Sequence, residues 1–152
     1  MATVRSKDGT SIAFDKQGSG PALILVDGAL CSRTMGPSAS LAALLKQHFT
    51  VYTYDRRGRG ESGDTAPYSV KREVEDIDAL VQDAGGSAFV WGMSSGGALV
   101  LEAANRLPGS SGSPSTRCRS SWTRAAAPWL IRGIRSERPS RPTSAAGRSA
   151  SS

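Results

Sequence analysis

The sequence of 152 residues contains one histidine and two cysteines. Cys31 and Cys118 have no spacing typical of metal ligands, so we expect two unpaired thiols and neither a metal site nor a cofactor. No run approaches the ~18 consecutive apolar residues that a membrane-spanning helix needs, and the N-terminus lacks the pattern of a signal peptide. These absences predict a cytoplasmic protein that does not contact a membrane.

Carboxylates are almost missing from the last third of the chain. Residues 108–152 contain eight arginines, no lysine and one acidic residue, Glu137, whereas residues 1–107 contain 11 basic and 12 acidic residues. The net charge of +6 therefore comes from the tail. Its arginines are scattered among serines without interleaved aromatic residues or an amphipathic period, which argues against binding to nucleic acid or to a membrane.

Large apolar residues are also few in the tail: Trp122, Trp129, Leu130, Ile131 and Ile134. Such a segment cannot bury enough surface to offset the entropy of ordering, so we expect residues 108–152 to be disordered. The composition changes abruptly at Gly109, and richness in Arg, Ser, Ala and Pro is also what a GC-rich coding sequence yields when it is read out of frame. Out-of-frame translation is therefore one explanation for the tail.

Residues 1–107 alternate short β-rich runs with helical patterns, which predicts an α/β fold with a mainly parallel sheet and helices on both faces. We expect strands at 11–17, 22–26, 49–54 and 88–91, and helices at 41–47, 70–83 and 96–106. The first two strands flank a Gly-Ser-Gly-Pro turn and are expected to pair with each other. The helices are expected to bury their periodic apolar residues, which are Leu41, Leu44 and Leu45, then Val70, Val74, Ile77, Leu80 and Val81, then Leu99, Val100 and Ala103.

One motif indicates chemistry: Gly92-Met93-Ser94-Ser95-Gly96 lies between an expected strand and an expected helix. In this context G-x-S-x-G is typical of a nucleophile elbow, a sharp turn that holds Ser94 clear of the sheet in a strained conformation. A Cβ atom at Gly92 or Gly96 would crowd this turn. The helix that follows directs its N–H groups toward the serine hydroxyl, so we expect the Ser95 N–H to be one donor to an oxyanion.

Three segments, in this order along residues 2–107, resemble the α/β-hydrolase family. Val26-Asp27-Gly28-Ala29-Leu30 is similar to the family's His-Gly-x oxyanion loop, with Asp27 in place of the usual histidine. Residues 55–63 (DRRGRGESG) are similar to its Asp-x-Arg-Gly-x-Gly-x-Ser turn, for which the alternative interpretation is a solvated basic loop. The elbow is the third segment. The resemblance implies that Ser94 attacks an ester or similar acyl carbon of a small molecule, with the Ala29 N–H as second oxyanion donor.

The family places an acid and then a histidine after the nucleophile. Here the single histidine, His48, precedes Ser94, and the carboxylates after Ser94 are Glu102, inside an expected helix, and Glu137, in the tail. A serine hydroxyl is a weak nucleophile without an adjacent base, so we expect a truncated family member that is inactive or nearly so. Two alternatives remain open: a cofactor-independent perhydrolase-like or haloperoxidase-like enzyme, and a non-catalytic fragment that acts as a binding partner.

The expected strand at 88–91 has a further consequence. Members of the family pair this strand with later strands, which a truncated chain would lack. An unpaired apolar strand edge is a template for pairing with another chain, so we expect self-association at this edge.

The out-of-frame explanation predicts a specific nucleotide sequence. Serine codons of the form TCN become NTC when the frame moves back by one base, and NTC encodes Phe, Leu, Ile or Val. Moving the frame back by one base after the Gly109 codon should therefore open a frame with apolar strands, a carboxylate and a late histidine. Sequencing the gene across this codon checks the prediction, and stop codons soon after it would contradict it.

Overall fold

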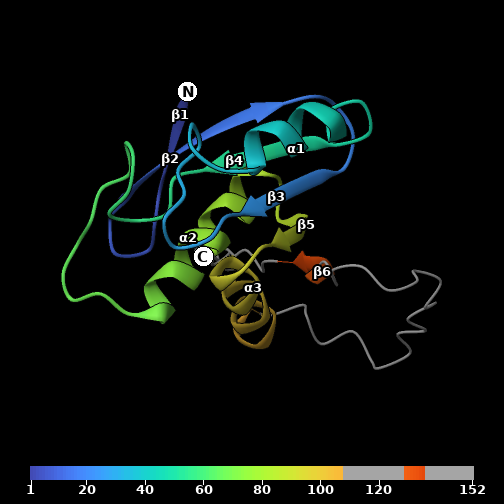
Figure 1. The fold of residues 1–152 in the computed structure, drawn as a ribbon. Coiled ribbons are helices and arrows are strands. Elements are labelled where there is room, and N and C mark those ends of the chain that lie inside the picture. Colours follow the sequence, from blue (N-terminus) through green and yellow to red (C-terminus); the bar gives the residue numbers. More distant parts are fainter. Residues whose placement is uncertain (108–128, 136–152) are drawn as a thin grey trace, which may run out of the picture.

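The computed structural model describes residues 1–107 and the backbone of residues 129–135 (Figure 1). Its six strands form one sheet in the order β1-β2-β4-β3-β5-β6. The strands are β1 (Ala2–Arg5), β2 (Ser11–Gln17), β3 (Ala22–Val26), β4 (Thr50–Tyr54), β5 (Ser87–Gly92) and β6 (Trp129–Arg135). The helices are α1 (Ser38–Leu45), α2 (Val70–Asp83) and α3 (Ser95–Arg106).

The centre of the sheet is parallel and its margins are antiparallel. The central strand β3 runs parallel to β4 and β5, with Ile24 opposite Tyr52 and Val90. The pairs β1/β2, β2/β4 and β5/β6 are antiparallel. The predicted α/β fold with helices on both faces is confirmed, and the sheet is mixed, with its parallel pairs at the centre.

The expected pairing of residues 11–17 with residues 22–26 is wrong, because β4 lies between these two strands. Phe14 of β2 pairs with Tyr54 of β4, and Ile24 of β3 pairs with Tyr52 of the same strand. Four of the five residues of β3 are buried. A strand that is apolar on both faces requires cover on both faces, which a central position in the sheet provides.

Part of the tail forms an element of the sheet. Trp129–Arg135 is a strand, β6, that pairs antiparallel with β5 and places Leu130 opposite Trp91. The prediction of a disordered tail is therefore wrong for these residues, and so is the expectation of an unpaired edge along 88–91. The remaining tail residues lie outside the described part of the chain, as does Cys118. The run WLIRGIR holds most of the tail's large apolar residues, and its tryptophan and isoleucines favour strands.

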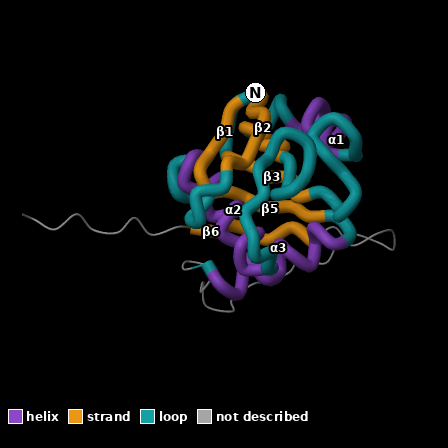
Figure 2. The backbone as a smooth tube through the Cα atoms, turned by 90° about the vertical axis from the view of Figure 1, so that its left-hand side faces the viewer, coloured by secondary structure: helices purple, strands orange, loops and turns teal. Residues whose placement is uncertain are grey.

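The hydrophobic core has one layer on each face of the sheet, because successive strand residues point to opposite faces. Ile24 and Val26 of β3 pack with residues of α2 and α3, whereas Leu23 and Leu25 pack with Ala42 of α1. In Figures 1 and 2, α1 lies apart from α2 and α3, across the sheet. None of the described helices is long and apolar enough to cross a membrane.

Helical periodicity predicts the buried face of two helices and misses that of the third. The apolar residues predicted for α3, and those of α2 except Val70, which is 48% exposed, are buried. In α1, Leu44 is 73% exposed, and the buried residues are Ser38 and Ala42. This helix begins three residues before the predicted start, and its small residues allow close packing on β3 and β4.

Two buried guanidinium groups connect the sheet to the surrounding segments. Arg57 donates to both carboxylate oxygens of Asp76 on α2, at 2.8 and 2.7 Å, and to Asp8 at 2.9 Å. Arg33 donates from its backbone N–H and its Nε to Asp55, which follows β4, at 2.7 and 2.9 Å. The residues 55–63 are therefore not a solvated basic loop, because the two arginines that directly follow Asp55 are buried.

The core residue Ile77 tests the packing of α2 on the sheet. Its side chain is fully buried, so Ile77→Ala should lower the free energy of unfolding by about 2–5 kcal/mol through lost burial and a residual cavity. The matched control is Leu44→Ala on the exposed face of α1, with an expected change within about 0.5 kcal/mol. Urea unfolding followed by circular dichroism measures both, and equal effects would contradict the assigned packing.

Asp8 should make the stability of the protein dependent on pH. The hydrogen bond from Arg57 holds the pKa of the Asp8 carboxyl below its usual range, more than burial raises it, with further help from Thr10. Below an unfolded-state pKa of about 3.9 the unfolded chain therefore binds the proton first, and the free energy of unfolding falls as the pH drops toward the folded-state pKa.

Asp8→Asn should flatten this acid limb, measured as urea midpoints over a pH series. The control, Asp64→Asn, makes the same change of charge on an exposed side chain and should keep the acid limb of the parent. An acid limb that is as steep in Asp8→Asn as in the parent would contradict the role of this ion pair.

Candidate active site

Ser94 lies in the turn between β5 and α3, where the sequence predicts a nucleophile elbow. Its backbone has φ 54° and ψ −127°, and it is the only non-glycine residue with positive φ in the part of the chain that the structure describes. Such a conformation costs about 1–3 kcal/mol and persists only where the surroundings impose it. Ser94 is exposed, and its side chain does not cap α3. Its hydroxyl is therefore not engaged by the helix that it begins.

Two glycines permit the close packing that imposes this turn. A Cβ atom on Gly92 would lie 2.5 Å from the carbonyl oxygen of Gly96, and a Cβ on Gly96 would overlap the carbonyl oxygen of Val26. Contacts of this kind are closer than real Cβ atoms show. The first turn of α3 can thus rest directly on the carboxyl end of β3 only because both positions lack a side chain.

The segment after β3 lies against the elbow. The Met93 N–H donates to the carbonyl oxygen of Val26 at 3.1 Å, and a Cβ on Gly28 would lie 3.9 Å from the Ser94 Oγ. The backbone N–H groups of Ala29 and Ser95 donate no hydrogen bond within the described part of the chain. Both lie on segments that adjoin Ser94, at the carboxyl edge of the parallel strands, where open α/β sheets bind their ligands.

Asp27 is 5% exposed. It occupies the position at which the His-Gly-x oxyanion loop has its histidine. Burial raises the pKa of its carboxyl, and the neighbouring Ser38 opposes this rise. Its Oδ1 atom has no hydrogen-bond partner among the described residues. Its Oδ2 is directed toward Gly36, where an added Cβ would lie 2.9 Å away. The carboxylate thus lies close to the backbone of the loop at Gly36.

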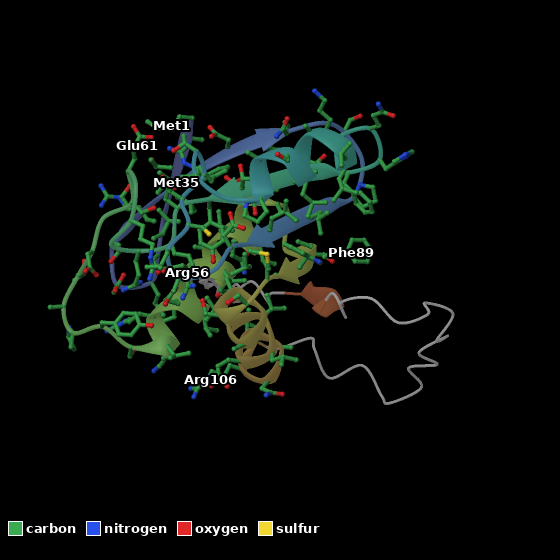
Figure 3. The ribbon with its side chains drawn as sticks, viewed as in Figure 1. Met1, Met35, Arg56, Glu61, Phe89 and Arg106 are labelled. Carbon is green, nitrogen blue, oxygen red and sulfur yellow. The ribbon has the colours of Figure 1, made fainter. Side chains whose placement is uncertain are left out.

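Arg56 connects the segment after β3 to the start of α3. The sequence predicted no role for this residue. Its Nη1 donates to the carbonyl oxygen of Asp27 at 3.3 Å and to the Ser95 Oγ at 3.1 Å. Its Nε and Nη2 donate to Glu73 of α2 at 2.6 and 2.7 Å. In Figure 3, Arg56 lies between α2, α3 and the sheet. Burial alone would raise the pKa of Glu73, but hydrogen bonds from Arg56 and Tyr68 and the charge of Arg56 lower it.

A signal for this ion pair is present in the sequence. Glu73 and Asp76 continue with Ile77 and Leu80 at the spacing i, i+3, i+4 and i+7, so the two carboxylates share the buried stripe of α2. Acidic residues within an apolar stripe require buried partners, because an unpaired buried charge is costly. The arginines of the 55–63 turn are those partners.

Of the two candidate partners of Ser94 within the described residues, one lies at the opposite edge of the sheet and the other forms an ion pair. His48 is exposed in the turn before β4, at the amino end of the parallel strands, where its carbonyl oxygen faces Gly20. The five residues of β4 span about 16 Å, so His48 lies far from the carboxyl edge. Glu102 forms an ion pair with Arg106 within α3. Glu137 lies outside the described residues.

A hollow of about 540 Å³ adjoins the elbow between α2 and α3. Arg56, Tyr68, Ser95, Leu99 and Arg106 are among the residues that line it. In the described part of the chain no group of three or more His, Cys, Asp and Glu side chains could hold a metal ion. Cys31, in the loop after β3, is a free thiol.

Comparisons with known proteins agree with this geometry. A profile described as "Alpha/beta hydrolase family" matches residues 25–151. Zearalenone hydrolase from Cladophialophora bantiana is 28% identical over 115 residues, which are 70% of this chain and 42% of that protein. The crystal structure of an alpha/beta hydrolase from Sphaerobacter thermophilus DSM 20745 superimposes on this chain with a TM-score of 0.65 and 59% sequence identity. The match covers 68% of this chain and 39% of that one.

A thermophilic esterase from Thermogutta terrifontis superimposes with a TM-score of 0.62 at 26% identity, over 69% of this chain and 40% of the esterase. The chain thus spans about two fifths of the length of these relatives. The family profile covers more than half of the chain, and the fold superimposes on a solved alpha/beta hydrolase. This protein belongs to the α/β-hydrolase family.

Proposed function

We propose that the elbow is an acyl-transfer site of the serine hydrolase type, with Ser94 as nucleophile and the backbone N–H groups of Ala29 and Ser95 as oxyanion donors. The observation that carries the proposal is the strained conformation of Ser94, with φ 54°, at the exposed carboxyl edge of the sheet. Strain at such a position is typical of a functional site. An esterase and hydrolases among the similar proteins support a small ester or related acyl compound as substrate.

The proposed step forms one bond and breaks another. The Ser94 Oγ attacks the acyl carbon while its proton passes to a base, which is solvent water where the protein supplies none, and the carbonyl electron pair moves to oxygen. The two N–H groups stabilise that oxyanion, and each such donor contributes about 10²–10³ to the rate in enzymes where it has been removed. Collapse of the intermediate returns the pair to the carbonyl and breaks the bond to the alkoxide. The alkoxide takes up a proton from water and departs as the alcohol, which leaves an acyl-serine.

We further propose that this chain turns over slowly, because no described residue supplies a base beside Ser94. His48 lies at the opposite edge of the sheet, and Glu102 is engaged with Arg106. Without a general base the serine stays protonated, and the remaining rate enhancement comes from the oxyanion donors and from binding, about 10³–10⁴ over water in enzymes stripped of their triad. Oxyanion stabilisation and proton transfer are thus separable in this protein.

Replacing the nucleophile separates these two claims. A thiol ionises without help from a neighbouring base, so Ser94→Cys, in a background with Cys31→Ser and Cys118→Ser, should release one equivalent of p-nitrophenolate from p-nitrophenyl acetate in a burst. The parent and Ser94→Ala should hydrolyse this ester at nearly equal rates. Stopped-flow absorbance measures the burst, and mass spectrometry locates the acetyl group.

The two claims fail in different ways. If the thiol introduced by Ser94→Cys were acylated no faster than free N-acetylcysteine at the same thiolate concentration, the acyl-transfer site would be wrong. Robust hydrolysis by the parent that Ser94→Ala abolishes would support the site, but it would contradict the missing base.

A further inference from the structure

We propose that Arg56 is the positioning residue of the oxyanion site, which it holds together by joining the segment of Ala29 to the segment of Ser95. The inference rests on the proposed function and assigns a role to a residue that does not touch the substrate. One guanidinium nitrogen, Nη1, reaches both segments, at the Asp27 carbonyl oxygen and the Ser95 Oγ.

The two oxyanion donors come from different parts of the chain. Ala29 follows β3 and Ser95 begins α3, so their separation depends on tertiary contacts between the two segments. A functional group displaced by about 0.5 Å loses much of its effect. Nη1 donates to the carbonyl oxygen two residues before Ala29 and to the side chain of Ser95 itself. Its contacts therefore restrain the spacing of the two N–H groups.

Arg56 is itself held in a fixed orientation. Its other donors form a two-point contact with the Glu73 carboxylate, and Glu73 also accepts from the Tyr68 hydroxyl at 2.8 Å. The side chains of Arg56 and Glu73 are 7% and 2% exposed. A planar guanidinium with a two-point carboxylate partner cannot rotate without breaking both bonds, so Nη1 remains directed at the site.

The test compares two reactions of one thiol in the Ser94→Cys, Cys31→Ser, Cys118→Ser background. With p-nitrophenyl acetate the introduced thiolate adds to the acyl carbon, the carbonyl pair moves to oxygen, and the oxyanion collapses to a thioester and p-nitrophenolate. With iodoacetamide the same thiolate displaces iodide at an sp³ carbon, and no oxyanion forms. The ratio of the acylation rate to the alkylation rate therefore cancels changes in the exposure and ionisation of the thiol.

Arg56→Met should lower this ratio about tenfold, less than the ~10²–10³ for complete loss of a donor, because the N–H groups remain but are no longer held together. Arg106→Met is the matched control. It removes a guanidinium that lines the same hollow but pairs with Glu102 on the surface of α3, and the ratio should stay that of the background protein.

A second variant separates loss of positioning from loss of the fold, because Arg56→Met leaves the buried Glu73 carboxylate without its arginine partner and can unfold the protein. Arg56→Met/Glu73→Gln removes both charges and should show the same fall in the ratio. A ratio that stays at the background value in a folded variant would overturn the positioning role, and so would loss of the native circular dichroism spectrum in both variants. If the background thiol itself shows no enhanced acylation, the proposed function has failed, and Arg56 has no oxyanion site to position.

Discussion

Burial of guanidinium groups beside the carboxyl end of β4 is the constraint on which the described structure depends. Arg33, Arg56 and Arg57 are 8%, 6% and 3% exposed, and each would be costly to bury without an ionised partner. Their carboxylates come from distant segments: Asp55 after β4, Glu73 and Asp76 on α2, and Asp8 in the turn after β1. The sheet, α2 and the N-terminal hairpin are therefore tied together by charges as well as by apolar packing.

The strained backbone of the elbow is imposed by the packing of α3 against the sheet. Ser94 has a backbone conformation that an isolated turn would not keep, and it is imposed by the approach of α3 to β3 at Gly96 and of α3 to β5 at Gly92. Buried Leu99, Val100 and Ala103 hold α3 on the sheet. Strain at the serine is thus offset by packing farther along the same helix.

The proposed chemistry divides between two sources. The oxyanion donors are backbone groups just after β3 and at the start of α3, so they require only the first elements of the fold. A general base must instead be a side chain directed at the Ser94 hydroxyl. Among the described residues, His48 lies at the opposite edge of the sheet and Glu102 is paired with Arg106. In the proposed chemistry, the oxyanion donors therefore depend on backbone positions of the first elements of the fold, whereas the base depends on the position of a side chain.

Local sequence patterns were enough to predict most strands and helices and the turn at Ser94. The strands at 11–17 and 22–26 and the helix at 70–83 have the predicted bounds, because alternation and helical period report directly on which side chains are buried. The motif at 92–96 predicted a strained turn, since its two glycines and its serine lie within five consecutive positions of the chain.

Contacts between segments that are distant in the sequence could be identified only from the tertiary structure. Sequence alone wrongly paired 11–17 with 22–26 and left 88–91 unpaired, because strand order depends on which residues meet in space, and β4 and β6 meet those strands from far along the chain. The contacts of Arg56 with Asp27, Glu73 and Ser95 span 17 to 39 positions of sequence. The sequence by itself determined where Ser94 turns, because backbone strain and glycine packing are local. Only the fold decided what holds that turn in place, because buried charges find their partners across the sheet.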